Sequence, residues 1–211
     1  MIVTKEVTTG FVEEEVKHMY GIGVVIIHAY TGNILTVKEL QDKERTGRKR
    51  GQVSIPLETR KPGEDVYTNL LGALPEVFDD VDHQGNDIKQ ELYLSLFHIG
   101  QEAFYNQAVV QKYPGSIVYC DIGVLIYQGS EITPQSYNSL EVSPLGWMSP
   151  SDFLQNEHIR PLAKEVVQNM HDSGFLEKHR QKAQHPDLLY PVLPADFSVR
   201  EFYHKRERQR D

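Results

Sequence analysis

Acidic side chains recur at helical spacing in one short segment of the chain. Glu76, Asp79 and Asp80 stand at positions i, i+3 and i+4, so a helix through them would present three carboxylates on one face. Glu64 lies upstream, in a Pro-Gly-Glu turn. Carboxylate oxygens are hard ligands that hold Mg²⁺ or Mn²⁺, and such ions neutralise phosphate charge and activate water. The chemistry to consider is therefore metal-assisted hydrolysis of a phosphate compound.

Two cations precede these acidic residues. Arg60 and Lys61 stand just before the turn, where they could bind phosphate oxygens. The alternative is that both side chains are simply solvated. Glu64 likewise either binds a ligand or caps the turn, and the three downstream carboxylates either form a metal site or are the solvated acidic end of a helix.

A strand and a helix must position these groups. Apolar residues alternate with other types over residues 53–57, which is the pattern of a strand, and an apolar helical run follows the turn. Within that run, Gly72 costs about 1 kcal/mol and Pro75 about 3 kcal/mol relative to Ala. The proline ring would also clash with the carbonyl of Leu71. We therefore expect one helical turn to end near Leu74 and another to begin at Pro75.

Residues 51–80, with this order of strand, Pro-Gly-Glu turn, helix and acidic end, resemble the box of the Nudix superfamily. That box reads Gly, five residues, Glu, seven residues, then Arg-Glu-apolar-any-Glu-Glu-any-Gly-apolar. Glu64, preceded by Gly63, matches the first box glutamate, and Leu74 and Glu76 match within the core. We call residues 51–80 the box segment.

Other positions of the box segment depart from the family pattern. The departures are Glu58 for the first Gly, Gly72 for the Arg, Ala73 and Val77 for two core carboxylates, and Asp79 and Asp80 for the last Gly-apolar pair. The resemblance implies a metal held by several box carboxylates against a diphosphate, so these losses leave a poor metal cage. The site residues implied are Glu64 and Glu76 as catalytic groups, Arg60 and Lys61 as ligand-binding groups, and Glu76, Asp79 and Asp80 as metal ligands shifted along the chain.

The resemblance covers residues 21–170 and implies an α/β fold, a Nudix-like α/β/α sandwich with a mixed β-sheet. The sequence supports it with apolar strand patterns at residues 21–27, 34–40 and 116–127. A further edge strand is expected over residues 2–7. Ser149 or Ser151 is a candidate helix N-cap, and an apolar stripe over residues 159–170 predicts a helix.

Two parts are expected along the chain. Residues 1–170 form the Nudix-like domain, and residues 171–211 form a proline-containing extension with a basic tail. From residue 178 to the end, eight Lys and Arg residues face five Asp and Glu residues. This balance predicts salt-sensitive contacts with an acidic partner, with RNA, or with the chain's own acidic body. Because the box segment and the long apolar strands lie upstream, removal of residues 199–211 is expected to leave the core folded.

Composition narrows the function further. A chain of 211 residues with 39% apolar content can bury one substantial core. The net charge of −8 argues against general affinity for nucleic-acid backbones. The single Cys120 excludes an intrachain disulfide, and neither a signal sequence nor a membrane-spanning apolar run is apparent. A cytoplasmic protein without a membrane partner is expected.

The sequence leaves more than one function open. The resemblance favours a Nudix-like protein that binds a nucleotide or a nucleoside-diphosphate-linked ligand with little or no hydrolysis. The alternatives are an active Mg²⁺- or Mn²⁺-dependent diphosphatase using the shifted carboxylates, and a protein-interaction domain. Ligand identity and oligomeric state cannot be read from the residues, because specificity in such folds lies in loops.

Overall fold

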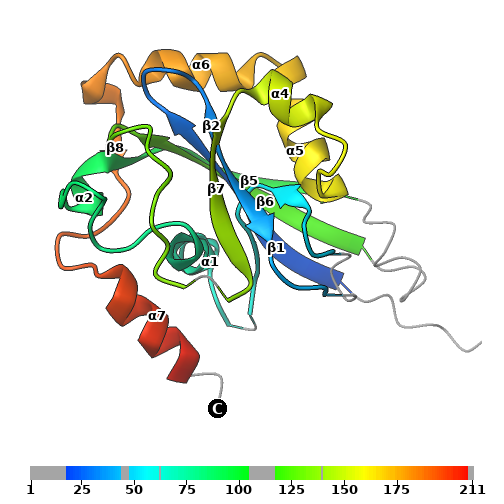
Figure 1. Cartoon of the computed structure of the whole chain (residues 1–211), viewed down its shortest axis with the longest axis horizontal. Coiled ribbons are helices and arrows are strands. Elements are labelled where there is room, and N and C mark those ends of the chain that lie inside the picture. Colours follow the sequence, from blue (N-terminus) through cyan, green and yellow to red (C-terminus); the bar gives the residue numbers. More distant parts are fainter. Residues whose placement is uncertain (1–17, 44–47, 62, 105–116, 139, 209–211) are drawn as a thin grey trace, which may run out of the picture.

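A mixed β-sheet with helices on both faces forms the body of the protein (Figure 1), so the expected α/β/α sandwich is confirmed. The computed structural model describes residues 18–43, 48–61, 63–104, 117–138 and 140–208. The edge strand expected over residues 2–7 lies outside these ranges, as do the last three residues of the basic tail.

Strands β3, β2, β1, β6, β5 and β8 follow one another across the sheet, while β4 pairs with β1 and β7 pairs with β2. Strands β1 and β6 run parallel, and the other pairings are antiparallel. The strands are β1 His18–His28, β2 Ile34–Glu39, β3 Val53–Ser54, β4 Leu57–Thr59, β5 Leu92–Phe104, β6 Ile117–Tyr127, β7 Val142–Met148 and β8 Tyr190–Pro191.

Strand β1 is central and buried on both faces. Ile22, Val24 and Ile26 pack into one hydrophobic core, and Val25 and Ile27 pack into the other. Burying an aliphatic side chain of this size contributes roughly 1.5–3 kcal/mol. The two long apolar strands predicted from the sequence are confirmed as β1 and β6.

Helices divide between the two faces (Figure 1). One face carries α4 Pro150–Gln155, α5 Pro161–Asp172 and α6 Phe175–Lys182. The other carries α1 Val66–Ala73, the 3₁₀ turn η2 Leu74–Glu76, the short α2 Ile88–Glu91 and the C-terminal α7 Val199–Arg208. A second 3₁₀ turn, η3, spans Pro186–Leu188. Among the helices described, none combines the length and apolarity needed to cross a bilayer.

Two helix predictions are confirmed at residue level. Ser149 caps α4, because its Oγ accepts a hydrogen bond of 3.1 Å from the backbone N–H of Asp152. Helix α5 covers most of the predicted stripe and buries Leu162, Val166 and Met170 against the sheet.

Residues 171–208 complete both cores. Strand β8 extends the sheet by pairing Tyr190 with Leu94 of β5. Leu176 of α6 joins the core on the α5 face, and Val199 of α7 joins the core on the α1 face. The extension is therefore packed onto the same sheet as the rest of the protein.

Candidate functional site

The box segment folds as the short strands β3 and β4, a tight turn and the helix pair α1–η2. The single strand expected over residues 53–57 is therefore divided, since β3 pairs with β2 and β4 pairs with β1. Gly63 has φ of +82°, a left-handed conformation that favours glycine, and this allows the chain to reverse before Glu64. The Glu64 Oε2 accepts a hydrogen bond of 2.9 Å from the backbone N–H of Lys61. Asp65 then caps α1 by accepting a hydrogen bond of 2.6 Å from the Thr68 N–H.

The helix breaks where the sequence predicts. Helix α1 ends at Ala73, and the 3₁₀ turn η2 begins at Leu74 with Pro75 in its first turn. Because proline has no N–H, Pro75 could not have donated the helical hydrogen bond to the carbonyl of Leu71. The carboxylates after the break therefore do not continue the face of α1.

Arg206 of α7 holds the carboxylates at the start of the box segment. Its Nε and Nη2 donate to the two oxygens of Glu64 over 2.8 and 3.0 Å, in a bidentate contact. Its Nη1 lies 2.8 Å from Oε1 of Glu58. The Arg206 side chain is 9% exposed, so solvent screens these contacts little.

Arg206 also sets the protonation of both carboxylates. Burial raises the pKa of Glu58, and the charge of Arg206 only partly opposes that rise. Burial acts in the same direction on Glu64, but hydrogen bonds from Arg206 and the Lys61 backbone outweigh it and hold the Glu64 pKa below its ordinary value. Glu64 is therefore the ionised partner of Arg206 at neutral pH.

Asp79 and Asp80 contact the beginning of α7. Arg200 forms a bidentate pair with Asp79, over 2.7 and 2.6 Å, and this hydrogen bonding lowers the Asp79 pKa. Asp80 accepts hydrogen bonds from the Val199 N–H over 2.6 Å and from the Ser198 hydroxyl over 3.0 Å. A carboxylate at this position satisfies free N–H groups of α7 and interacts favourably with the helix dipole. We call the six charged residues of this region the tail cluster: Glu58, Glu64, Asp79, Asp80, Arg200 and Arg206.

Glu76 lies near Glu58, a member of the tail cluster. Its side chain is buried, with the residue 7% exposed, and its Oε2 has no hydrogen-bond partner among the described residues. Burial raises the Glu76 pKa well above its ordinary value, and the nearby charge of Glu58 raises it further, while Arg48 opposes the rise. Across the described ranges, no three His, Cys, Asp or Glu side chains gather so that they could hold a metal ion.

The structure thus places the predicted metal ligands in different surroundings. Asp79 and Asp80 accept hydrogen bonds from residues of α7, whereas Glu76 is buried in the interior of the domain. The predicted catalytic pair, Glu64 and Glu76, is also divided, because Arg206 binds Glu64. The three shifted carboxylates follow one another in sequence without forming a common site.

Arg60 and Lys61 lie in different surroundings. The Arg60 guanidinium lies 4.8 Å from the centre of the Tyr20 ring, in a cation–π contact, and 3.9 Å from Asp121. Its side chain remains 26% exposed. The Lys61 Nζ is buried. Of the two, only Arg60 presents its cation toward solvent.

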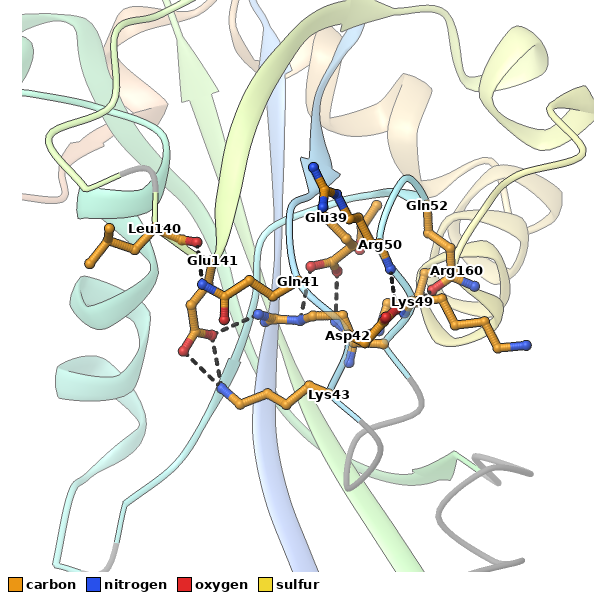
Figure 2. A network of polar contacts seen from close by, with 12 residues as sticks. Glu39, Gln41, Asp42, Lys43, Lys49, Arg50, Gln52, Leu140, Glu141 and Arg160 are labelled. Carbon is orange, nitrogen blue, oxygen red and sulfur yellow. Dashed lines mark hydrogen bonds and ion pairs between the residues drawn. The ribbon is translucent and has the colours of Figure 1, made fainter.

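A second group of charges lies beside Glu76, and the sequence analysis missed it. Glu39 of β2 is 1% exposed and pairs with Arg48 over 2.9 Å and with Arg160 over 3.0 Å. Arg48 also binds Glu141 over 2.6 Å, and Lys43 reaches the same carboxylate over 2.8 Å. Figure 2 shows Glu39 and Arg160 meeting at one side of this network and Lys43 reaching Glu141 at the other.

We call Glu39, Arg48, Glu141 and Arg160 the central cluster. The available signal was Glu39, an acidic residue at the end of a strand with apolar residues at positions 34, 35 and 37, which must be paired if it is buried. The partners could not be assigned, because they come from a charged loop, from the residue just before β7 and from the N-cap of α5.

Comparisons with known proteins identify relatives by structure only. No protein-family model and no curated protein matches the sequence. A bifunctional NMN adenylyltransferase/ADP ribose pyrophosphatase from Francisella tularensis, complexed with AMP and Mn ion, gives a TM-score of 0.51 at 9% identity. The match covers 75% of this chain and 42% of that chain.

Two further solved structures resemble the chain over a similar length. The MutT protein from Methanosarcina mazei Go1 gives a TM-score of 0.47 at 14% identity, covering 76% of this chain and 97% of that chain. A Nudix hydrolase from Nitrosomonas europaea gives a TM-score of 0.40 at 13% identity, covering 84% of this chain and 97% of that chain. At such identities the likeness concerns the fold.

Proposed function

The chain has the Nudix fold, and from this premise we propose that it is a non-hydrolysing member of that fold. It would bind a nucleotide or a nucleoside-diphosphate-linked ligand and leave the diphosphate intact. The observation that carries the proposal is the position of Arg206, whose guanidinium forms ion pairs with both Glu58 and Glu64.

A divalent ion needs carboxylate oxygens that are ionised and free to approach it. In the tail cluster those of Glu64 and Asp79 each accept two hydrogen bonds from an arginine. An incoming Mg²⁺ would have to displace one of these guanidinium groups, and that of Arg206 is largely buried. The residues present therefore do not fit a metal-activated water in this arrangement.

The alternative of an active diphosphatase with shifted carboxylates meets the same obstacle. Asp80 is engaged with the first turn of α7, and the raised pKa of Glu76 favours a protonated side chain, which is a weak metal ligand. Mg²⁺ or Mn²⁺ could bind these carboxylates only if α7 moved away from the box segment. These contacts support the non-hydrolysing proposal over the enzymatic one.

The ligand class rests on analogy of fold, which raises a hypothesis and does not establish a function. The Francisella tularensis protein was solved with AMP, so adenine nucleotides are the first compounds to test. Arg60 is the cation of the box segment that could contact a phosphate, since its side chain is partly exposed.

A panel assay tests this proposal. AMP, ADP-ribose, NAD, nucleoside triphosphates, dinucleoside polyphosphates and capped RNA are incubated with the full chain and Mg²⁺ or Mn²⁺, and products are separated by chromatography. Binding of each compound is measured in parallel by calorimetry. We expect binding of at least one compound, weakened in Arg60→Gln, with no metal-dependent product.

Two outcomes would overturn the proposal. Turnover that disappears in Glu76→Gln would mean that the box segment is catalytic. Absence of binding across the whole panel would reject the ligand and favour the protein-interaction alternative.

A further inference from the structure

The guanidinium of Arg206 fills the space that a side chain at position 72 would need. A Cβ atom added to Gly72 would lie 2.2 Å from Nη1 of Arg206 and 2.5 Å from its Cζ, far inside van der Waals contact. The guanidinium therefore lies directly on the bare backbone of α1, and any side chain at position 72 would collide with it. Position 72 is also where the Nudix box carries its arginine.

We propose that Arg206 supplies, from the C-terminal helix, the arginine that the box segment lacks at position 72. The positive charge has moved along the sequence by more than half the chain, yet it lies over the same turn of α1. Its carboxylate partners, Glu58 and Glu64, belong to the segment that leads into that helix. Arg206 is thus a positioning residue for the box segment, and α7 is a permanent part of this site.

The rest of α7 is built to hold this arginine in place. Val199 is 1% exposed and lies in the core, and Phe202 packs against the same core. Asp80 caps the first turn of the helix. Outside the helix, the hydroxyl of Tyr137 lies 2.6 Å from Nε2 of His204. With the first turn and the middle of the helix held in this way, the guanidinium reaches Glu58 and Glu64 at little further entropic cost.

The inference goes beyond the proposed function, because it concerns where the charge comes from and not what the domain binds. It also accounts for two unusual residues with one cause. Glycine in a helix interior is unfavourable, but here it makes room for the guanidinium. A buried arginine near the chain terminus is likewise costly unless carboxylates pair with it.

A double-substitution cycle tests the transposition. Thermal unfolding is measured for the full chain, Gly72→Arg, Arg206→Met and the combination. Arg206→Met is expected to lower Tm by roughly 5–15 °C, since it leaves two carboxylates without their partner. Gly72→Arg should lower Tm in the natural background, where the new side chain meets Arg206, and should raise it in the Arg206→Met background.

This reversal of sign is the expected result, and an effect of Gly72→Arg with the same sign in both backgrounds would overturn the proposal. If Arg206→Met does not fold, the double variant decides alone: recovery of a cooperative transition supports the transposition, and failure to recover it rejects the transposition. The matched control is Lys205→Met, an exposed cation on the same helix, which should shift neither background.

A titration separates positioning from bulk stability. The Glu64 side-chain pKa is followed by NMR in the same four proteins where they fold. It should rise in Arg206→Met, because a stabilising hydrogen bond is lost, and it should fall again when Gly72→Arg is added. A Glu64 pKa that is unchanged by both substitutions would contradict the proposal, whatever the unfolding data show. No ligand or metal is used, so the result is independent of the panel assay.

Discussion

Two charged clusters flank the buried Glu76, and they differ in where their cations come from. The central cluster takes its arginines from the body of the domain, at positions 48 and 160. The tail cluster takes both of its arginines from α7, in the C-terminal extension. The central cluster is the more deeply buried, since Arg200 in the tail cluster is 54% exposed.

The difference indicates what each cluster does. Deep burial makes the central cluster structural, because a charge there must be paired or the strand ends cannot pack. The tail cluster instead pairs its arginines with Glu64, which matches a box glutamate, and with Glu58 and Asp79, which do not. If this comparison holds, damage to the central cluster harms the fold alone, whereas damage to the tail cluster uncovers the acidic face of the box segment.

Truncation after Ser198 should have the largest effect and would break the tail cluster altogether. It removes Arg200 and Arg206 and the apolar side chains of Val199 and Phe202. We expect a loss of roughly 5 kcal/mol or more in the free energy of unfolding. Chemical denaturation measures it, with truncation after Arg208 as the control that retains the whole of α7. An unchanged midpoint would restore the expectation, drawn from sequence alone, that residues 199–211 are dispensable.

Breaking the central cluster should cost somewhat less. Glu39→Gln removes the shared partner of Arg48 and Arg160 and leaves two buried guanidinium groups underpaired. The expected loss is about 3–5 kcal/mol, measured by urea denaturation. Lys43→Met at the exposed rim of the same network should cost less than about 1 kcal/mol. Equal losses for the two variants would mean that burial does not distinguish the central charges.

The helix caps Asp65 and Asp80 allow a further comparison, with smaller expected effects on stability. Asp65 caps α1 from the adjacent residue, whereas Asp80 caps α7 from a distant part of the chain. Each change to Ala should cost about 1 kcal/mol. Only Asp80→Ala should accelerate amide hydrogen exchange in α7, since only that cap joins α7 to the box segment. Equal acceleration of α7 exchange in Asp65→Ala would contradict the expectation that only the Asp80 cap connects α7 to the box segment.

Glu76→Gln is the one change expected to increase stability. The folded-state pKa of Glu76 is raised above the unfolded value, so ionisation of this group opposes folding. The penalty is absent below the unfolded pKa and grows as pH rises from there toward the folded pKa. Glu76→Gln should therefore match the natural protein at pH 4 and exceed its stability at pH 8. Lower stability of the variant at pH 8 would show that the negative charge is needed between the two clusters.

Sequence reasoning succeeded where local patterns decide the outcome. The uninterrupted apolar residues of β1 and β6 predict buried strands, and Pro75 predicts the break between α1 and η2. Both follow from the side chains of neighbouring residues, without knowledge of distant contacts. Ser149, as an N-cap three residues before Asp152, is a case of the same kind.

It failed where a residue's role depends on distant partners. Asp79, Asp80 and Glu76 have the spacing of a metal site, but spacing does not reveal that α7 binds the first two from the end of the chain. For the basic tail, the sequence left several acidic partners open, with the chain's own acidic body among them, and in the structure Arg200 and Arg206 bind carboxylates of the box segment. Gly72 looked like a lost arginine, because nothing local indicates that Arg206 fills its place.

The most direct test of this account is the side-chain Nε–H resonance of Arg206 in a ¹⁵N-labelled full chain, measured by NMR without metal or ligand. Because that N–H donates to Glu64 over 2.8 Å and is mostly buried, we predict a resolved signal that exchanges slowly with water. In Glu64→Gln the signal should shift and exchange faster. A rapidly exchanging Arg206 signal that is indifferent to Glu64→Gln would place the guanidinium in solvent and contradict the claim that α7 occupies the box carboxylates.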